Sequence, residues 1–330
     1  MKENLLSALP IDKLRGKNIL ITGACGLIGG TLVDVLLSAT TGSVVYALVR
    51  NAAKTRQRFA TYLNRSDFHI IENDVNTPLN SNIVFHYIIH AASNANPNAY
   101  ALDPVGTMWT NLNGTHNLLE YGRLHTLERF LYVSSGEVYG NGGNAIWKES
   151  DSGYIDTMSV RSCYPSSKRA AETLCTAYSE QYGIDTLVAR PCHTYGPHFT
   201  DNDNRAYAQF VRKARRHENI VLKSKGEQYR SWIYVADCAI AILMILLSGE
   251  NRQAYNIADT HSNITIRELA EQIAAIAGTE VVFDLPDTIE KKGYSEMKRA
   301  IFDISRLEAL GWQPQYTLEE GLRHTIEDIL

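Results

Sequence analysis

The sequence predicts an α/β protein built on a doubly wound parallel sheet of Rossmann type. Two observations predict this class. Short apolar runs alternate with longer stretches of helical periodicity, and a glycine-rich turn joins the first apolar run to the first helix. Six runs have the composition of buried strands, and they cover Lys17–Thr22, Ser43–Val49, Phe68–Ile71, Ile83–His90, Arg129–Ser134 and Thr186–Arg190.

The composition excludes several classes of protein. The 330 residues, 45% of them apolar, suit one large α/β unit or two closely joined domains. The 32 basic and 36 acidic residues give a net charge of −4 without a basic block, so no nucleic-acid partner is expected. The longest apolar run, Ala236–Leu247, contains Asp237 and is too short to span a bilayer. The N-terminus does not resemble a signal peptide, so we expect a soluble, cytoplasmic protein without a membrane partner.

Cysteine usage agrees with that location. The cysteines are scattered and lack the spacing of metal ligands, so free thiols in a reducing compartment and no metal site are expected. They are Cys25, Cys163, Cys175, Cys192 and Cys238.

The glycine-rich turn is a candidate pyrophosphate site. It reads Gly23-Ala-Cys-Gly26-Leu27-Ile28-Gly29 and lies between the first strand and the first helix. Glycines allow a tight turn and close backbone approach, and a helix N-terminus attracts negative charge. The strand, turn and helix together predict dinucleotide binding. The alternative is a tight turn without a ligand.

The end of the second strand bears on the choice between NAD and NADP. An acidic residue there would favour NAD through the ribose hydroxyls. The chain instead has Arg50, with Lys54 and further arginines close behind. A basic residue at this position favours tolerance of the 2′-phosphate of NADP. The expected cofactor is therefore NAD or NADP, with a lean towards acceptance of NADP. The alternative is a solvated basic helix.

Other strand ends supply small or polar residues to the same edge of the sheet. Asp74 and Val75 follow the third strand, and Asp74 is expected to meet the adenine amino group. Ala91, Ala92 and Ser93 follow the fourth strand, where small residues let the chain pass close to a cofactor. Strand ends of one edge form the binding crevice of an open parallel sheet.

Tyr164 and Lys168 form the candidate catalytic pair. An apolar, alanine-rich run follows them, so they are expected on one helix, where positions four apart share a face. A free tyrosine has a pKa of about 10, and a neighbouring cation lowers it. Such a tyrosine can take a proton from an alcohol while hydride leaves the same carbon. The alternative is a surface Tyr–Lys pair.

Taken together, the motifs resemble the extended short-chain dehydrogenase/reductase family, in its NAD-dependent nucleotide-sugar epimerase/dehydratase branch. They keep that family's order: Thr22-Gly23-x-x-Gly26-x-x-Gly29, Asp74-Val75, His90-Ala91-Ala92, Ser134-Ser135-x-x-Val138-Tyr139-Gly140, Tyr164-x-x-x-Lys168, Arg190-Pro191, Tyr195-Gly196-Pro197, Arg230-Ser231-x-x-Tyr234-Val235-x-Asp237 and Leu310-Gly311-Trp312-x-Pro314. The resemblance implies a dinucleotide-binding domain, mainly residues 1–190, and a smaller C-terminal α/β substrate-binding part, mainly 191–330. The chain is expected to cross back around 232–258.

The resemblance also implies roles for single residues. Ser135, Tyr164 and Lys168 would form the catalytic triad, and Lys168 would also hold the nicotinamide ribose. Arg230 would grip the substrate diphosphate, a task suited to a guanidinium fork. His193 replaces an asparagine that usually touches the diphosphate, and both a substrate contact and a core histidine remain open.

Two further segments are similar to substrate loops of UDP-glucuronate decarboxylases. They are Asn202-Asp203-Asn204-Arg205 and Pro97-Asn98-x-Tyr100. Tyr100 and Arg205 are therefore expected to contact the substrate.

The presence of Glu137 indicates chemistry beyond simple inversion at C4. Relatives that act at C5 of the sugar, the dehydratases and decarboxylases, carry a glutamate here, and a dry cleft would suit it to proton transfer. The alternative is that Glu137 caps a turn or pairs with a nearby cation. Gly136 stands where dTDP-glucose-type dehydratases have an acid, which counts against that elimination.

The resemblance implies an enzyme that oxidises the C4 hydroxyl of a nucleotide-diphosphate sugar with tightly bound NAD(P)+. The 4-keto sugar would then epimerise, dehydrate or decarboxylate. A one-way dehydrogenase or ketoreductase is an alternative, and a non-enzymatic dinucleotide sensor is another. The base and the sugar stay open. A homodimer is expected through helices near Ala99–Arg123 and Tyr164–Tyr182.

Overall fold

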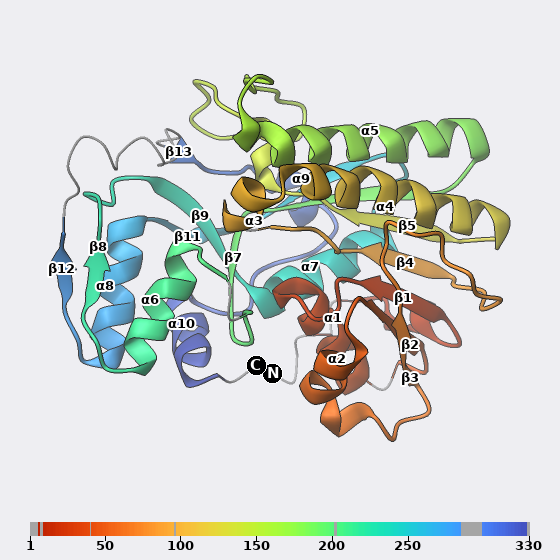
Figure 1. The fold of residues 1–330 in the computed structure, drawn as a ribbon, viewed down its shortest axis with the longest axis horizontal. Helices are drawn as coiled ribbons and strands as arrows, with labels where there is room; N and C mark the ends of the chain where they lie inside the picture. Colours follow the sequence, from red (N-terminus) through yellow and green to blue (C-terminus); the bar gives the residue numbers. More distant parts are fainter. Residues whose placement is uncertain are drawn as a thin grey trace.

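The computed structural model describes Leu6 and residues 9–39, 41–95, 97–200, 203–284 and 299–328; Asn202 of the predicted substrate loop lies outside them. A seven-stranded parallel sheet with helices on both faces forms the larger part, and smaller sheets with their own helices adjoin it (Figure 1). The Rossmann-type α/β class is therefore confirmed. The assignment of residue ranges to a cofactor domain and a substrate domain stays a prediction.

The large sheet has the strand order β10-β6-β5-β4-β1-β2-β3. Its strands are β1 (Asn18–Thr22), β2 (Val44–Val49), β3 (Phe68–Glu72), β4 (Tyr87–His90), β5 (Arg129–Val133), β6 (Thr186–Pro191) and β10 (Ala254–Ile257). The order reverses direction at β1, which places a crevice at the carboxyl ends of β1 and β4.

Alternate side chains of β1 belong to different cores. Ile19 and Ile21 pack in the cluster that contains α1 (Leu27–Ser38) and α7 (Val235–Ser248), whereas Leu20 packs in the cluster that contains residues of α4 (Pro104–Leu124) and α5 (Cys163–Tyr182). A strand covered on both faces must be apolar at every position, which is why these runs carry no polar alternation.

Most strands match the predicted runs to within one residue at each end, and two differences are larger. The predicted fourth strand began at Ile83, but β4 begins at Tyr87. The Tyr121 hydroxyl of α4 donates to the carbonyls of Ser81 and Ile83 at 3.0 and 2.6 Å, so part of this backbone is held by a helix. The second difference is β10, which was not predicted as a strand of this sheet and pairs with β6.

The glycine turn is shaped by close backbone packing. Gly23 has φ +67°, and a Cβ there would lie 2.8 Å from the Ala91 carbonyl oxygen at the end of β4. A Cβ on Gly29 would lie 2.4 Å from the Gly23 carbonyl oxygen. Both contacts involve backbone atoms, so no side chain is accommodated at either position.

The smaller part is organised around β9 (Tyr229–Tyr234), which pairs with three strands. These are β7 (His193–Tyr195), β11 (Asp259–Thr265) and β13 (Arg299–Ala300). A separate pair joins β8 (Ile220–Leu222) and β12 (Val281–Phe283). The other helices are α2 (Ala52–Arg58) and α3 (Pro97–Leu102) in the larger part, then α6 (Ala206–Arg215), α8 (Ile266–Ala277), α9 (Ser305–Glu308) and α10 (Leu318–Glu327).

Buried polar contacts tie the two parts together. The Asp237 carboxylate, in the first turn of α7, accepts hydrogen bonds from the backbone N–H groups of Gln315 and Tyr316, each at 3.0 Å. A carboxylate that accepts two backbone donors is stabilised in its charged form. The C-terminal chain is thereby attached to a helix of the large sheet.

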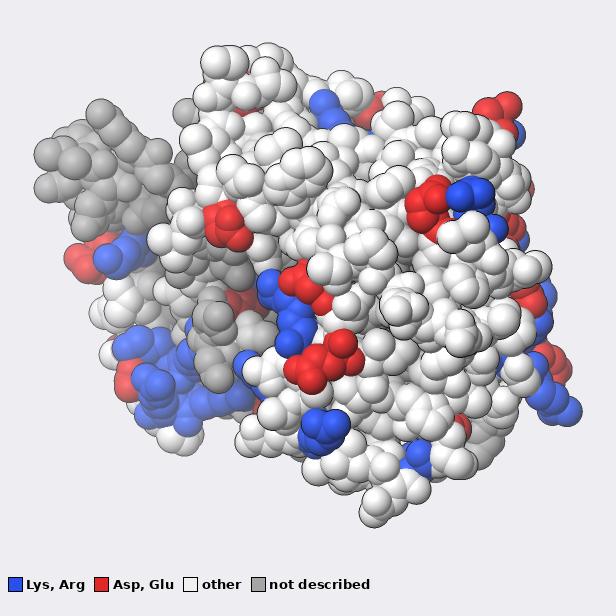
Figure 2. Space-filling view, turned by 45° about the vertical axis from the view of Figure 1, so that its right-hand side comes forward, with Lys and Arg blue, Asp and Glu red and all other residues white. Residues whose placement is uncertain are grey.

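Within the described residues, no helix has the length and apolarity that a membrane crossing requires. The same part of the chain contains no group of three or more His, Cys, Asp or Glu side chains placed to hold a metal ion. Figure 2 shows acidic and basic side chains in small mixed clusters on the face it presents, with a more basic group at the lower left.

Candidate active site

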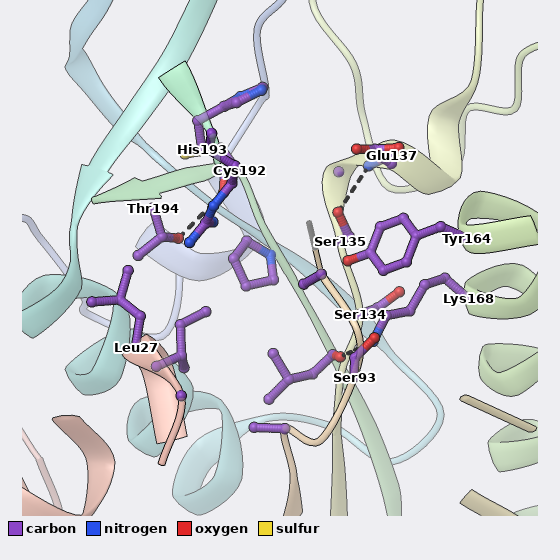
Figure 3. Close-up of a pocket in the computed structure, with 18 of the residues that line it drawn as sticks. Leu27, Ser93, Ser134, Ser135, Glu137, Tyr164, Lys168, Cys192, His193 and Thr194 are labelled. Atoms are coloured by element: carbon purple, nitrogen blue, oxygen red, sulfur yellow. Dashed lines mark hydrogen bonds between the residues drawn. The ribbon is translucent and has the colours of Figure 1, made fainter. Parts of the chain in front are cut away.

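A pocket opens at the carboxyl ends of the parallel strands and is closed on one side by the smaller part of the molecule. Figure 3 shows Tyr164 and Lys168 pointing into it from α5, with Cys192, His193 and Thr194 on the opposite wall. Its lining includes the glycine turn, the ends of β4, β5 and β6, the start of α5, and Ala300 and Phe302. Residues far apart in the sequence therefore meet at one site.

Tyr164 is buried, with 5% of its surface exposed. Ser135 lines the same pocket beside it (Figure 3), and its ring stacks on Tyr100 with centroids 4.7 Å apart and planes at 25°. Burial raises the pKa of Tyr164 to about 12, and the Glu137 carboxylate adds to the rise, while Ser135, Arg205 and Arg161 oppose it. A lowered pKa, the direction expected from the Tyr–Lys spacing, is therefore not found.

Burial of Tyr164 itself is the main cause of this difference, and Lys168 is buried as well. Its Nζ donates to the Val133 carbonyl at 2.8 Å and lies 5.8 Å from the centre of the Tyr164 ring. Burial lowers the pKa of Lys168 to about 7, partly offset by Glu172. A buried ammonium loses the solvation that water gives its charge, so Lys168 is a weaker source of positive charge than a solvated lysine.

Ser135 begins the short 3₁₀ helix η3 (Gly136–Tyr139), and its Oγ accepts the Glu137 N–H at 3.2 Å. The Glu137 carboxylate lies 2.6 Å from Arg161 Nη2, and its side chain is 37% exposed. The dry cleft expected around this carboxylate is therefore not found, because the carboxylate lies at the pocket rim and is paired with a cation. This agrees with the alternative of a nearby cation.

A glycine at position 136 is explained by the lack of space for a side chain. A Cβ there would lie 2.4 Å from the Phe302 ring, which lines the pocket beside Ala300. The position at which dTDP-glucose-type dehydratases carry an acid is thus filled by an aromatic ring from the C-terminal part. The ring also packs on Tyr139, with centroids 5.6 Å apart.

All residues predicted to touch the dinucleotide line this pocket or an adjoining one. Leu27, Ile28, Gly29, Tyr164 and Lys168 line the first pocket. Arg50, Asp74, Val75 and Ala92 line the adjoining one, and Gly23, Gly26, Ala91 and Ser93 line both.

The backbone of the glycine turn makes these residues suitable for a dinucleotide. The cradle at the start of α1 has no room for side chains at Gly23 and Gly29, which leaves backbone N–H groups to face a pyrophosphate. In addition, the buried Oγ of Ser134, which lines the first pocket, has no hydrogen-bond partner among the described residues.

The predicted substrate residues divide into two groups. Tyr100, His193 and Arg205 line the pocket, and Arg205 is held by Asp203, whose Oδ1 lies 2.9 Å from Arg205 Nε. Arg230 does not line it. Arg230 is buried on β9, where burial lowers its pKa.

His193 is held neutral in the pocket wall. Burial lowers its pKa to about 3, and the charges of Arg230 and Arg205 act in the same direction. Its ring packs against Trp232 with centroids 5.3 Å apart, and its Nδ1 has no hydrogen-bond partner among the described residues. A neutral imidazole with an unused nitrogen can still donate or accept one hydrogen bond.

Three residues of the site were not predicted. Asn111 of α4 accepts from the Ser93 hydroxyl at 2.8 Å and donates to the Ser167 hydroxyl at 2.9 Å, which links the end of β4 to α5. Phe302 lies far from the other motifs in sequence, so no local signal points to it. Arg161 precedes Tyr164 by three positions, and that spacing is the signal that could have identified it.

Comparison with known proteins gives a consistent result. The sequence model of the NAD dependent epimerase/dehydratase family matches residues 19–258. UDP-glucuronic acid decarboxylase 6 of Arabidopsis thaliana is 33% identical over 94% of this chain and 88% of its own length. UDP-glucuronic acid decarboxylase 1 of Xenopus tropicalis is 32% identical over 94% and 71%.

Solved structures agree in fold. The UDP-glucose 4-epimerase of Thermotoga maritima with UDP-glucose superposes with a TM-score of 0.82 and 25% identity, covering 94% of this chain and 98% of that one. The dTDP-glucose 4,6-dehydratase of Bacillus anthracis in complex with NAD gives a TM-score of 0.79 at 22% identity, covering 94% and 96%. The chain belongs to the NAD dependent epimerase/dehydratase family.

Proposed function

We propose that this protein oxidises the C4 hydroxyl of a nucleotide-diphosphate sugar and then acts at C5, with a UDP-uronic acid as the preferred substrate and decarboxylation as the outcome. The observation that carries the proposal is the meeting of Tyr164, Ser135 and buried Lys168 in one pocket that the glycine turn also lines. The relatives named UDP-glucuronic acid decarboxylases support the choice of substrate.

Tyr164 takes the proton of the C4 hydroxyl. When bound, oxidised NAD(P) supplies the acceptor for the C4 hydride and a positive charge beside the site. Ser135 favours the ionised form of the phenol, which partly offsets the effect of burial. Lys168, held on the Val133 carbonyl, has a pKa of about 7 and can exchange protons near neutrality.

The C4 ketone makes decarboxylation possible. A carboxylate on C5 is then β to a carbonyl, so the bond from C5 to the carboxylate carbon breaks and carbon dioxide leaves. The electron pair is held as the enolate of C4, and a proton returns to C5. Glu137 lies at the pocket rim and is the nearest carboxylate to Ser135 along the chain, so we assign it to this later proton transfer. Turnover is completed when C4 regains the hydride from the bound cofactor and its oxygen regains the proton from Tyr164.

The first test uses UDP-glucuronate, UDP-glucose and dTDP-glucose as parallel substrates. Mass spectrometry should find loss of carbon dioxide from UDP-glucuronate alone. Tyr164→Phe should fold and retain dinucleotide but lower turnover by about 100- to 10,000-fold, the range for loss of a general base. Wild-type turnover in this variant would contradict the mechanism. Stoichiometric release of reduced cofactor without carbon dioxide would favour a one-way dehydrogenase.

The second test separates oxidation from the later steps. A Glu137→Gln enzyme should still reduce its bound cofactor when substrate is added, because Tyr164 performs that step. It should then accumulate the 4-keto sugar, which mass spectrometry detects. In D2O the wild-type product should contain solvent deuterium at C5. Full turnover by the variant together with no deuterium in the product would leave a simple 4-epimerase as the better description.

We further propose that NADP binds at least as well as NAD. Arg50 directly follows β2, where no carboxylate stands, and it lines the adjoining pocket with Asn51 and Lys54. A guanidinium suits a 2′-phosphate. By calorimetry, Arg50→Ala should weaken NADP binding about tenfold, as expected for a charge-assisted hydrogen bond, and leave NAD binding nearly unchanged. A strong NAD preference in the unmodified protein would exclude this proposal.

A homodimer in the cytoplasm is proposed for the assembly and location. Several large apolar side chains of α3 and α4 are exposed: Leu102 (85%), Val105 (65%), Met108 (38%) and Trp109 (58%). Exposed apolar groups of this kind mark interaction surfaces. All five cysteines are free thiols, which suits a reducing compartment.

The dimer is tested by analytical sedimentation. The measured mass should be twice the mass of one chain, and Trp109→Glu should reduce it to the mass of the monomer. A monomeric wild-type protein would contradict the dimer.

A further inference from the structure

We infer that Arg161 is a positioning residue for the proton-transfer groups of the site. Its single guanidinium contacts both the Glu137 carboxylate and the Tyr100 ring, and Tyr100 is stacked on Tyr164. This inference rests on the proposed function, since it assigns to Arg161 the geometry on which Tyr164 and Glu137 act.

The contacts form a continuous stack at the pocket mouth. Arg161 lies on the short helix η4 (Val160–Ser162), directly before α5. Its guanidinium carbon is 4.7 Å from the centre of the Tyr100 ring, and that centre is 4.7 Å from the centre of the Tyr164 ring. Tyr100 is 3% exposed, whereas the Arg161 side chain is 50% exposed. The guanidinium therefore covers the outer face of a buried aromatic pair.

The same guanidinium fixes the carboxylate. Arg161 Nη2 lies 2.6 Å from Glu137 Oε2, within hydrogen-bond distance. Glu137 is also tied to the site through its backbone, because its N–H donates to Ser135 Oγ at 3.2 Å. Arg161 thus connects α3, η3 and α5, the elements that carry Tyr100, Glu137 and Tyr164.

The charges of Glu137 and Arg161 also influence the pKa of Tyr164. The Glu137 carboxylate raises the pKa of Tyr164 and the Arg161 guanidinium lowers it, after the larger effect of burial. Removal of Arg161 leaves the carboxylate without its counter-charge and makes the phenol harder to ionise. The groups that face Tyr164 are Tyr100, Tyr132, Glu137, Arg161, Lys168 and Arg205, together with the Ser135 hydroxyl.

An arginine suits this place better than a lysine. Its planar fork can pair with a carboxylate at its edge while its flat face lies on an aromatic ring. A lysine would keep the charge but lose this double contact. By contrast, an exposed ion pair with no further role contributes little to stability, so a purely structural Arg161 predicts small effects everywhere.

The experiment compares Arg161→Gln and Arg161→Lys with a matched control, Arg65→Gln. Arg65 also pairs with a carboxylate, Asp67 at 2.7 Å, and lies 6.0 Å over the Tyr62 ring, remote from the pocket residues. Single-turnover reduction of the bound cofactor by UDP-glucuronate should fall at least about tenfold in Arg161→Gln, with its pH dependence moved to higher pH. Arg161→Lys should recover part of the rate. Cofactor content, unfolding temperature and the Arg65→Gln control should remain near wild type.

A substrate-independent measurement keeps this test separate from that of the proposed function. In protein labelled with 13C at the tyrosine ring, the signal missing from Tyr164→Phe identifies Tyr164. Its titration should move to higher pH in Arg161→Gln and to lower pH in Glu137→Gln. Unchanged reduction rate and unchanged titration in Arg161→Gln would overturn the inference, as would losses that match a loss of folded protein. If no nucleotide sugar reduces the cofactor but the titrations shift as stated, the proposed function fails and the positioning role stands.

Discussion

Burial of Tyr164 and Lys168 at the end of β5 is the constraint on which the rest of the site depends. Their helix, α5, packs on α4, and the Asn111–Ser167 hydrogen bond at 2.9 Å joins the two. Lys168 is anchored on the last residue of β5 through the Val133 carbonyl. A phenol and an ammonium placed here lose water, so their ionisation depends on this burial and on the few charged or polar groups near them. Ser135, Glu137 and Arg161 are such groups for Tyr164.

The cradle for the dinucleotide depends on a different constraint, the close approach of β1 and β4. Thr22 at the end of β1 hydrogen-bonds His90 at 2.7 Å and accepts the Ala92 N–H at 3.1 Å. These bonds hold the chain after β4 against the glycine turn, where a Cβ on Gly23 would meet backbone atoms. Backbone N–H groups at the start of α1 are consequently the part of the turn that can face a phosphate.

The smaller part of the molecule contributes the opposite wall of the pocket. This wall limits the shape of a ligand that can fit there. Phe302 fills the space beside Gly136, so no acid can stand at that position without displacing the ring. Arg205 is oriented by Asp203. Arg230 lies buried on β9, where its charge adds to the effect of burial, which lowers the pKa of His193. The wall thus presents the Arg205 cation and one neutral imidazole, which suits a ligand that carries negative charge.

The sequence alone determined what depends on short spacing. The alternation of apolar runs and helices predicted six strands of the sheet, and the glycine turn predicted the dinucleotide cradle. The four-residue step from Tyr164 to Lys168 placed both residues on one helix face. Each of these patterns lies within a short stretch of sequence, so no knowledge of distant contacts is needed to recognise it. Only the tertiary structure decided the rest. The pairing of Glu137 with Arg161, the ring of Phe302 at Gly136 and the burial of Arg230 all depend on how distant segments pack. The ionisation of Tyr164 belongs to this second group, since desolvation is a property of the assembled core and is the largest influence on the pKa of Tyr164.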